Sequence, residues 1–321
     1  MRYLVLCGFL LLLVSGVYVL YVPAVDHTCL IHADLDTLEK KLEEHVWMLA
    51  ETIGERHFQN PGSLDRSATY IHDRFLQAGL QPRFHEYDEG TYRNVIADIN
   101  SGSHAGRMIL IGAHYDSVWM SPGADDNASG VAVLLELAGL LSGIEPGTTL
   151  RFVAFTNEEQ PFAGSGTMGS MVYLQQYHPH ADDIKAMYSL EMLGFYSDEP
   201  GSQVYPPPLK WIYPDTASFI AMVANLPSGR LLQRSLAAFR QQDNFPAQGL
   251  VMSEKLVPDI RRSDHAGFWD AGIPAIMITD TAFYRNNRYH TVGDLPHTLE
   301  YRSMAKLTSG LACMLDALAS E

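Results

Sequence analysis

The chain has 321 residues, an apolar fraction of 47% and a net charge of −15. A chain of this size suits one large α/β domain, and no internal repeat is visible. The strong negative charge argues against nucleic acid and anionic membrane surfaces as partners, and it mildly favours a cationic ligand such as a substrate amine.

The N-terminal segment is predicted to anchor the chain in a membrane. Residues 3–22 carry no charge and follow Arg2. About 20 apolar residues suit a spanning helix, whereas the apolar core of a signal peptide usually has about 7–15. We therefore expect residues 1–22 to be an uncleaved anchor, with the rest of the chain outside the cytoplasm in a periplasmic or extracellular position. Secretion after signal cleavage is the alternative.

The rest of the chain is expected to form a linker, residues 23–34, and one domain, residues 35–321. The three cysteines do not make a disulfide framework. Cys7 lies in the anchor, and Cys29 and Cys313 could pair, but we expect both to be free thiols. The sequence leaves the oligomeric state open.

Apolar spacing predicts helices over residues 35–53, 63–78 and 130–141, with Ser63 as an N-cap. Strand-like runs are found at residues 82–87, 94–99, 107–113, 150–156, 186–190 and 273–279. Because helices alternate with strands, we predict an α/β fold whose mostly parallel sheet is covered by helices on both faces. Between residues 195 and 262 the alternation of helix and strand patterns weakens, although residues 219–239 have helical composition. We interpret this stretch as an insertion that covers the functional site.

Candidate metal ligands recur next to these predicted strands. His114 follows one strand, the Glu158–Glu159 pair follows another, and Glu191 ends a third. Asp126 lies in a loop leading into a helix, and His290 follows the last strand. In open α/β sheets ligands bind outside the carboxyl ends of the strands, so we expect these side chains to meet at one edge. Each motif alone would more often be a helix cap, a solvated loop or a structural histidine.

Six motifs in this order resemble the M28 family of zinc metallopeptidases, which includes the co-catalytic aminopeptidases. They are Gly112-Ala-His-Tyr-Asp-Ser117, Pro122-Gly-Ala-Asp-Asp-Asn-Ala-Ser-Gly130, Asn157-Glu-Glu159, Leu190-Glu191-Met192, Ser263-Asp-His265 and Tyr289-His290-Thr291. The resemblance runs from about residue 50 to the C-terminus. It implies a zinc-aminopeptidase-like fold, two Zn²⁺ ions per chain and a peptide substrate with a free N-terminus.

The resemblance also implies a role for each residue. Asp126 would bridge the two zinc ions through a cis peptide bond to Asn127. His114 and Glu191 would complete one metal site, and Glu159 and His290 the other. Glu158 would be the general base and acid, Asp116 would orient His114, and Tyr289 would bind the oxyanion. Glu191 stands where many members of the family have aspartate, and the Asp264–His265 pair would have a supporting role.

Two other functions remain open from the sequence. A single-zinc glutaminyl cyclase keeps a similar skeleton but needs one metal ion. A membrane-anchored binding ectodomain on the same fold would have lost its ligands. The intact set of ligand types in this chain favours the exopeptidase.

Overall fold

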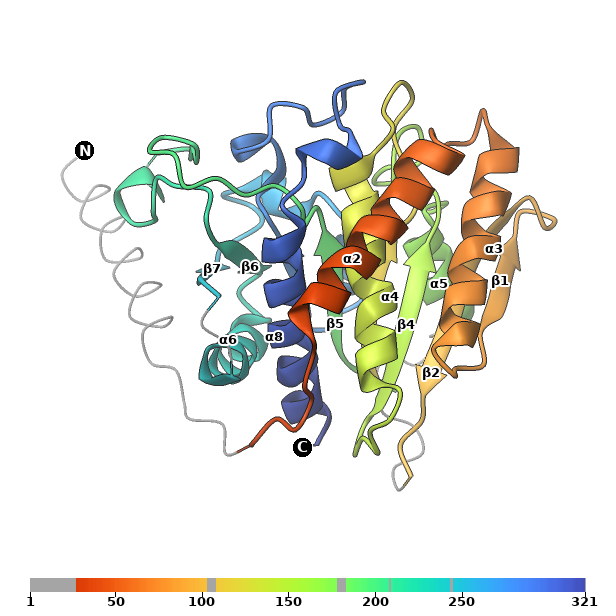
Figure 1. Cartoon of the computed structure of the whole chain (residues 1–321), viewed down its shortest axis with the longest axis horizontal. Coiled ribbons are helices and arrows are strands. Elements are labelled where there is room, and N and C mark those ends of the chain that lie inside the picture. The colour runs from red at the N-terminus through yellow and green to blue at the C-terminus, as the bar shows by residue number, and fades with distance from the viewer. Residues whose placement is uncertain (1–26, 103–107, 178–182, 208, 243–244, 321) are drawn as a thin grey trace.

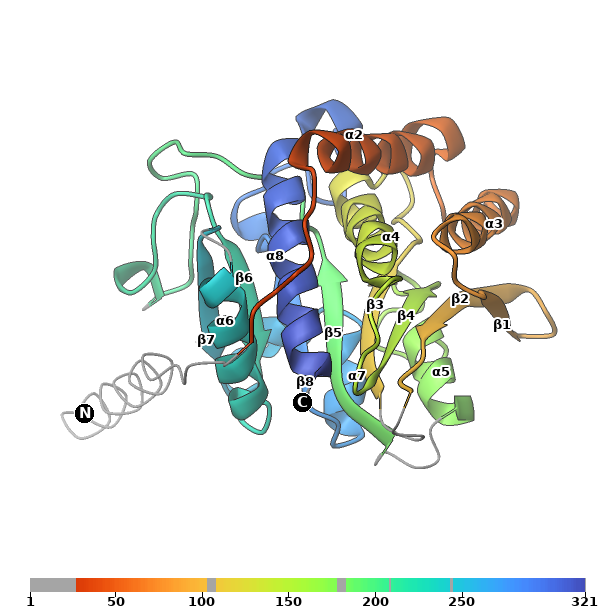
Figure 2. The same ribbon diagram turned by 60° about the horizontal axis from the view of Figure 1, so that its bottom comes forward.

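A single eight-stranded sheet forms the centre of the protein, with helices on both faces (Figure 1, Figure 2). The computed structural model describes residues 27–320, except residues 103–107, 178–182, 208 and 243–244. The strands are β1 (Arg83–Tyr87), β2 (Tyr92–Ile99), β3 (Met108–His114), β4 (Thr149–Phe155), β5 (Ile184–Glu191), β6 (Ile220–Ala224), β7 (Ala247–Val251) and β8 (Ala275–Thr279). The α-helices are α2 (Leu35–Val46), α3 (Pro61–Gln77), α4 (Gly130–Leu141), α5 (Gly169–Tyr177), α6 (Gly229–Gln242), α7 (His265–Asp270) and α8 (Tyr301–Ala319).

The strand order is β1-β2-β4-β3-β5-β8-β6-β7. The four central strands β4, β3, β5 and β8 are parallel, whereas β2 runs antiparallel to β4 and β6 runs antiparallel to β8. The sheet is therefore mixed: its centre and the edge pair β6–β7 are parallel, in line with the predicted mostly parallel sheet, whereas the β1–β2, β2–β4 and β6–β8 pairs are antiparallel. A short turn joins β1 to β2, and such a connection allows only antiparallel pairing. The carboxyl ends of the central strands all meet at one edge.

Helices α2, α3, α4, α6 and α8 cover one face of the sheet, and α5 and α7 cover the other (Figure 2). Helix α4 lies between the sheet and the helices α2 and α8. Nearly all of its residues are buried, which explains why its sequence is apolar on every side. The predicted helix at residues 130–141 is confirmed. It was recognisable in the sequence because a buried helix is an unbroken run of apolar residues without turn residues.

The helix predicted over residues 35–53 is helical throughout, although its α-helical part, α2, ends at Val46 and a π-helix, Trp47–Ile53, continues it. The start of the next helix differs from the prediction. Helix α3 begins at Pro61, where proline fits the first turn because it needs no N–H donor there. Ser63 is therefore inside the helix and not its N-cap, and its hydroxyl donates to the carbonyl oxygens of Glu55 and Asn60.

The stretch 195–262 is only in part the insertion that we expected. It contributes strands β6 and β7, which extend the sheet beyond β8, and helix α6, which packs against these two strands. The helical composition expected at 219–239 is wrong for its first residues, which form strand β6. All five β6 residues are buried, and a short apolar run of this kind has no periodicity that separates a strand from a helix.

The prediction of free cysteines is also wrong, because Cys29 and Cys313 form a disulfide. The first described residues run beside α8 (Figure 1), and His27 Nε2 lies 2.8 Å from the carboxylate of Asp316. This path places Cys29 next to Cys313, which lies on α8. The pairing depends on a contact across 284 positions of sequence, which local patterns do not reveal.

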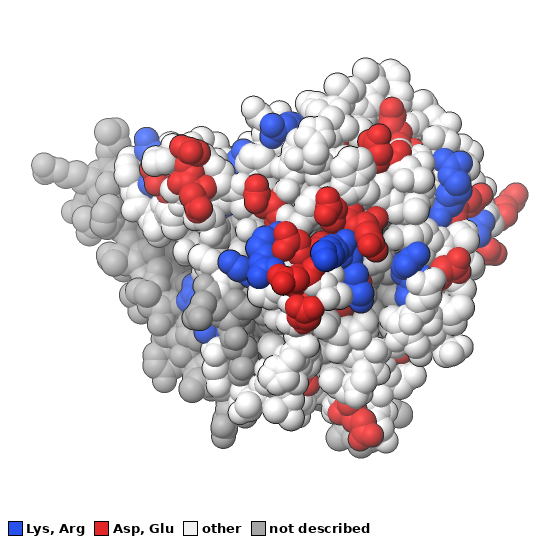
Figure 3. All heavy atoms as spheres, viewed as in Figure 1, with Lys and Arg blue, Asp and Glu red and all other residues white. Residues whose placement is uncertain are grey.

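The predicted anchor, residues 1–22, lies outside the described part of the chain. From His27 onward, the described residues include no helix that combines the length and apolar character needed to cross a membrane. On the face seen in Figure 3, acidic and basic side chains are interspersed. Arg302, for example, contacts both Asp36 and Glu39 on α2.

Candidate metal centre

The candidate ligands converge at the carboxyl edge of the central strands. His114 is the last residue of β3 and Glu191 the last residue of β5. Glu159 follows β4, and His290 lies in the segment between β8 and α8. Asp126 lies in a short irregular π-helix, Ala124–Ser129, that leads into α4. Because parallel strands end at the same edge, five segments distant in sequence deliver these side chains to one place.

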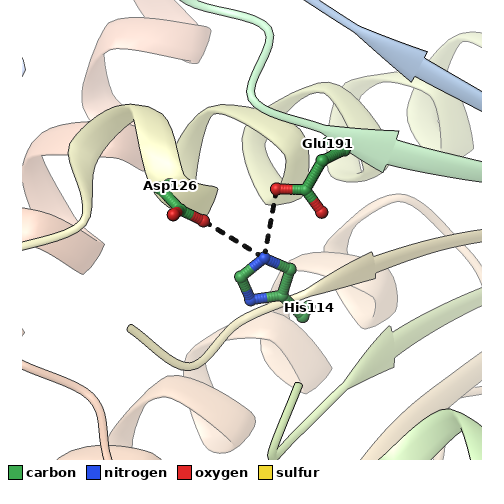
Figure 4. A group of neighbouring side chains, drawn as sticks. All are labelled: His114, Asp126 and Glu191. Atoms are coloured by element: carbon green, nitrogen blue, oxygen red, sulfur yellow. Dashed lines mark hydrogen bonds and ion pairs between the residues drawn. The ribbon is translucent and has the colours of Figure 1, made fainter. Parts of the chain in front are cut away.

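A first group consists of His114, Asp126 and Glu191 (Figure 4). His114 Nε2 lies 3.3 Å from Asp126 Oδ1 and 3.5 Å from Glu191 Oε1. All three side chains are buried, with 1%, 4% and 8% of their surface exposed. One imidazole and two carboxylates, closely spaced and removed from water, make a donor set that suits zinc.

A second group consists of Asp126, Glu159 and His290. His290 Nε2 lies 3.1 Å from Asp126 Oδ2 and 3.2 Å from Glu159 Oε1. The two oxygens of Asp126 thus face different histidines, which is the arrangement that a bridging carboxylate requires. The ligand atoms of each group lie within 4.8 Å of one another, so each group can close around one cation.

The electrostatics of these groups fit divalent cations. Burial opposes a charge on His290, but hydrogen bonds with Asp126 and Glu159 outweigh burial and raise the pKa of His290 to about 10. Burial would also raise the pKa of Asp126, yet hydrogen bonds with His114 and His290 lower it. Burial and the neighbouring Asp126 raise the pKa of Glu159 to about 7. Carboxylates held this close need positive charge between them, and a metal ion that replaces the histidine protons supplies it.

Asp116 connects His114 to the acidic pair. His114 Nδ1 lies 3.2 Å from the carbonyl oxygen of Asp116 and 3.5 Å from its Oδ1. The two carboxylate oxygens of Asp116 accept the backbone N–H groups of Glu158, at 3.1 Å, and Glu159, at 3.0 Å. A proton on Nδ1 of His114 leaves Nε2 to face the metal position, which is how metal-binding histidines are usually oriented.

Glu158 lines the same cavity as Asp126, Glu159 and His290. Its side chain is half-buried, and no basic side chain of the described residues forms an ion pair with it. Burial raises the pKa of Glu158 well above its usual range; His114 opposes this shift, whereas Glu159 adds to it. A carboxyl group of this kind can hold a proton near neutral pH.

Tyr289 stands beside the second group. Its ring stacks on His290, with 3.7 Å between the ring centroids. Burial, together with the nearby carboxylates of Asp126 and Glu159, raises the pKa of the Tyr289 hydroxyl, which therefore keeps its proton. Tyr289 lines two cavities, the one that contains Glu158 and a second, apolar one.

The apolar cavity adjoins the metal groups through Glu191 and Tyr289. Its walls come from the 203–213 segment, β6, β7, β8 and the 282–284 turn, and its volume is about 130 Å³. An apolar cavity of about 150 Å³ is large enough to take up benzene. The space therefore fits one apolar side chain. Tyr205, Pro206 and Arg262 are among its walls.

Arg56 is the main functional residue that the sequence did not indicate. It is fully buried and donates five hydrogen bonds to the backbone carbonyl oxygens of Leu49, Gly54, Tyr115, Pro122 and Gly123. Burial lowers the pKa of its guanidinium to about 10, so it stays charged at neutral pH. Its contacts fix the segment between His114 and Asp126.

Asp294 and Ser263 also contact the segments that carry the metal ligands, and neither contact was predicted from the sequence. The Asp294 carboxylate accepts the backbone N–H groups of Asp125, at 2.8 Å, and Asp126, at 3.1 Å. The Ser263 hydroxyl donates to Glu191 Oε2 at 2.6 Å. The Ser263-Asp264-His265 motif was the available signal for Ser263. Asp294 lies outside every motif that we identified.

The expected cis peptide bond between Asp126 and Asn127 is observed. Asp264 and His265 are buried near the centre. Burial raises the pKa of Asp264 to about 7, an effect that the charge of His114 opposes.

The comparison with known proteins identifies the family. The family model for Peptidase family M28 matches residues 94–314. The chain is 40% identical to the uncharacterized protein YfbL of Escherichia coli over 287 residues, which cover 86% of this chain and 87% of YfbL. It is 30% identical to an aminopeptidase of Pseudomonas aeruginosa over 181 residues, which cover 56% of this chain but only 29% of that protein.

Solved structures share the fold. The aminopeptidase from Aneurinibacillus sp. strain AM-1 superposes with a TM-score of 0.65 at 16% identity, covering 86% of this chain and 93% of that one. The glutaminyl cyclase of Porphyromonas gingivalis gives a TM-score of 0.60 at 20% identity, covering 88% and 99%. The fold alone therefore does not separate peptidase from cyclase. The family match spans more than half of the chain, so this protein belongs to peptidase family M28 and is a metallopeptidase.

Proposed function

We propose that the protein is a two-zinc aminopeptidase. The observation that carries this proposal is the position of Asp126, whose Oδ1 faces His114 and whose Oδ2 faces His290. His114, Asp126 and Glu191 would hold one ion, and Asp126, Glu159 and His290 would hold the other. Bound zinc supplies polarisation of the scissile carbonyl and activation of a water molecule near neutral pH.

The other residues of the site then perform the proton and charge steps. Glu158 takes a proton from the attacking water and passes it to the leaving amine, which its raised pKa allows. Asp116 holds the backbone of Glu158 and Glu159 and orients His114. The protonated hydroxyl of Tyr289 donates to the oxyanion that develops on the scissile carbonyl.

The apolar cavity next to Glu191 and Tyr289 suits the side chain of the N-terminal substrate residue. Residues of β6, β7 and β8 line the cavity, and its volume of about 130 Å³ fits one side chain and not an extended peptide. We therefore propose peptides with an apolar N-terminal residue, such as leucine, methionine or phenylalanine, as substrates. The free amine of such a peptide lies among the carboxylates of the metal centre.

The test is a substrate panel combined with metal analysis of the purified full chain. We expect two zinc ions per chain and hydrolysis of peptides that carry a free N-terminal leucine, with little cleavage of their N-acetylated forms. Cleavage of acetylated peptides without cleavage of free ones would overturn the aminopeptidase assignment. Cyclisation of N-terminal glutamine with one bound zinc would instead support the cyclase, whose fold this chain shares.

We also propose that the catalytic domain lies outside the cytoplasm, held to the membrane by residues 1–22. The disulfide between Cys29 and Cys313 supports this location, because disulfides persist in oxidising compartments. N-terminal sequencing of membrane-extracted protein tests the anchor, and thiol labelling tests the disulfide. A mature chain that starts near residues 23–30 would contradict the anchor, and two reactive thiols at Cys29 and Cys313 would contradict the oxidising location.

A further inference from the structure

The chain that follows Glu191 is held in place by side chains of the Asp125–Ser129 stretch. Asn127 Nδ2 donates to the carbonyl oxygen of Leu190 at 2.8 Å, and Asn127 Oδ1 accepts the N–H of Met192 at 3.0 Å. One side-chain amide therefore brackets Glu191 from both sides. Strand β5 ends at Glu191, and just beyond it the carbonyl oxygen of Met192 accepts the N–H of Asp280 at 2.7 Å.

The same pattern continues along both segments. Ser129 Oγ accepts the N–H of Leu193 at 2.8 Å, and Asp125 Oδ1 accepts the N–H of Gly194 at 2.9 Å. The residues at 125, 127 and 129 thus hold the 190–194 segment, whereas Asp126 between them faces the two histidines. The stretch Asp125–Ser129 therefore supplies Asp126, the ligand that both metal sites share. It also supplies the hydrogen bonds that support Glu191, a ligand of the first site.

This support matters because of the backbone at Met192. Its φ is +49°, a left-handed conformation that side chains other than glycine rarely adopt. Such a residue persists only where its surroundings hold it. The N–H of Met192 is the group that Asn127 Oδ1 accepts. The turn that directs Glu191 toward His114 therefore relies on Asn127.

We propose that Asn127 is a positioning residue that sets the zinc affinity of the first site, formed by His114, Asp126 and Glu191. The inference rests on the proposed two-metal function. Ser263 fixes Oε2 of Glu191, and Asn127 fixes the backbone on either side of it. Together these contacts direct Oε1 of Glu191 to His114.

The effect is specific to the first site. Asn127 is fully buried, and its side-chain amide forms hydrogen bonds with Leu190, Met192 and Gly130. None of them belongs to the segments of Glu159 or His290. The second site shares only Asp126 with the first, and the Asp126 backbone is also held by Asp294.

The substitution Asn127→Asp isolates this role. It keeps the oxygen that accepts from Met192 and Gly130 but replaces the donor to Leu190 with a second oxygen. That oxygen faces the Leu190 carbonyl without a hydrogen between them, which pushes the end of β5 away. Loss of a partner that supports a metal ligand typically lowers metal affinity by about 10–100-fold.

Zinc affinity is measured by competition with a chelator in two backgrounds of the full chain. His290→Ala leaves the first site alone, and His114→Ala leaves the second. We expect Asn127→Asp to weaken zinc binding about 10–100-fold in the first background. In the second background we expect a change of less than about twofold, because the Asn127 side chain contacts none of the segments that carry Glu159 and His290. Equal weakening in both backgrounds, or none in the first, would overturn the inference.

Controls separate this result from misfolding and from failure of the proposed function. Asn225→Asp makes the same change at a buried asparagine near Glu254, and should leave both affinities unchanged. If Asn127→Asp does not fold without metal, Ser129→Ala, which removes the acceptor of Leu193 and the donor to the Asp125 carbonyl oxygen, must show the same preference for the first site. A wild-type chain that binds fewer than two zinc ions would instead refute the two-metal function itself.

Discussion

The guanidinium of Arg56 donates a hydrogen bond from Nη2 to the carbonyl oxygen of Gly123 at 2.8 Å, three residues before Asp126. Gly123 has a φ of +63°, and a Cβ there would approach Arg56 Nη2 to 2.8 Å. The glycine and the arginine therefore fit each other at the turn that leads to the bridging carboxylate.

We expect Arg56→Lys to lower both stability and activity. Lysine keeps the charge, but its three donors cannot serve five carbonyl oxygens, and each buried oxygen left unpaired costs about 1–3 kcal/mol. The free energy of unfolding should fall by about 2–5 kcal/mol, measured by urea unfolding without metal. The ratio kcat/KM should fall as well, because the segment between His114 and Asp126 shifts.

Arg302→Lys is the matched control. Arg302 is exposed and pairs with Asp36 and Glu39, so its replacement should change the free energy of unfolding by less than about 1 kcal/mol. If Arg56→Lys and Arg302→Lys lowered the free energy of unfolding equally, the buried hydrogen bonds of Arg56 would add no more stability than the exposed ion pairs of Arg302.

Filling the apolar cavity should change substrate preference. Ala221, on β6, lines this cavity, and Ala221→Leu would occupy part of the space. We expect kcat/KM for peptides with N-terminal leucine or phenylalanine to fall about 10–200-fold relative to N-terminal alanine. The ratio of the two kcat/KM values is the measurement, because it cancels any loss of folded protein.

Ala247→Leu serves as the control for overpacking alone. Ala247 lies on β7 in the hydrophobic cluster on the other side of the sheet, together with Leu236 and Phe239. It should reduce stability without changing the preference between leucine and alanine. An unchanged preference in Ala221→Leu would mean that the side chain of the substrate binds elsewhere.

His265 should make the metal-free protein less stable in acid. It is fully buried, its Nε2 lies 2.7 Å from the carbonyl oxygen of Ile260, and burial lowers its pKa to about 4. In the unfolded chain its pKa is about 6.5, so between pH 6.5 and 4 the unfolded state binds the extra proton. The contribution of His265 is fully present above pH 6.5 and is lost as pH falls toward 4, by about 2 kcal/mol at pH 5.

Urea unfolding at pH 7 and pH 5 tests this dependence. His265→Gln should lose about 2 kcal/mol less than wild type on acidification. Trp269→Phe alters the ring packed against His265 without removing a titratable group, so it should keep the wild-type dependence. The same dependence in wild type and His265→Gln would contradict a neutral, buried His265.

The sequence predicted the parts of the site that follow strands directly. His114 and Glu191 end strands β3 and β5, and an apolar run that stops at a histidine or a glutamate is visible without a structure. Arg56 could not be found in this way, because its partners lie at residues 49–54 and 115–123 and are backbone atoms. Strand β6 was missed because its five residues carry no periodic signal.

We propose that Glu158 moves protons whereas its neighbour Glu159 binds metal. Glu159 Oε1 lies 3.2 Å from His290 Nε2, while Glu158 forms no ion pair with a basic side chain in the described part of the chain. Both backbone N–H groups are held by Asp116, so the two side chains are presented from one fixed turn. Replacing each carboxylate by an amide therefore separates the two roles.

The most direct measurement is zinc stoichiometry and kcat for Glu158→Gln and Glu159→Gln, with the exposed Glu145→Gln as the control. We expect Glu158→Gln to keep two zinc ions and to lose about 10²–10⁴-fold in kcat. Glu159→Gln should lose one zinc ion and activity with it, and Glu145→Gln should change neither. Near-normal kcat in Glu158→Gln, or loss of zinc from Glu158→Gln while Glu159→Gln keeps both ions, would contradict the account.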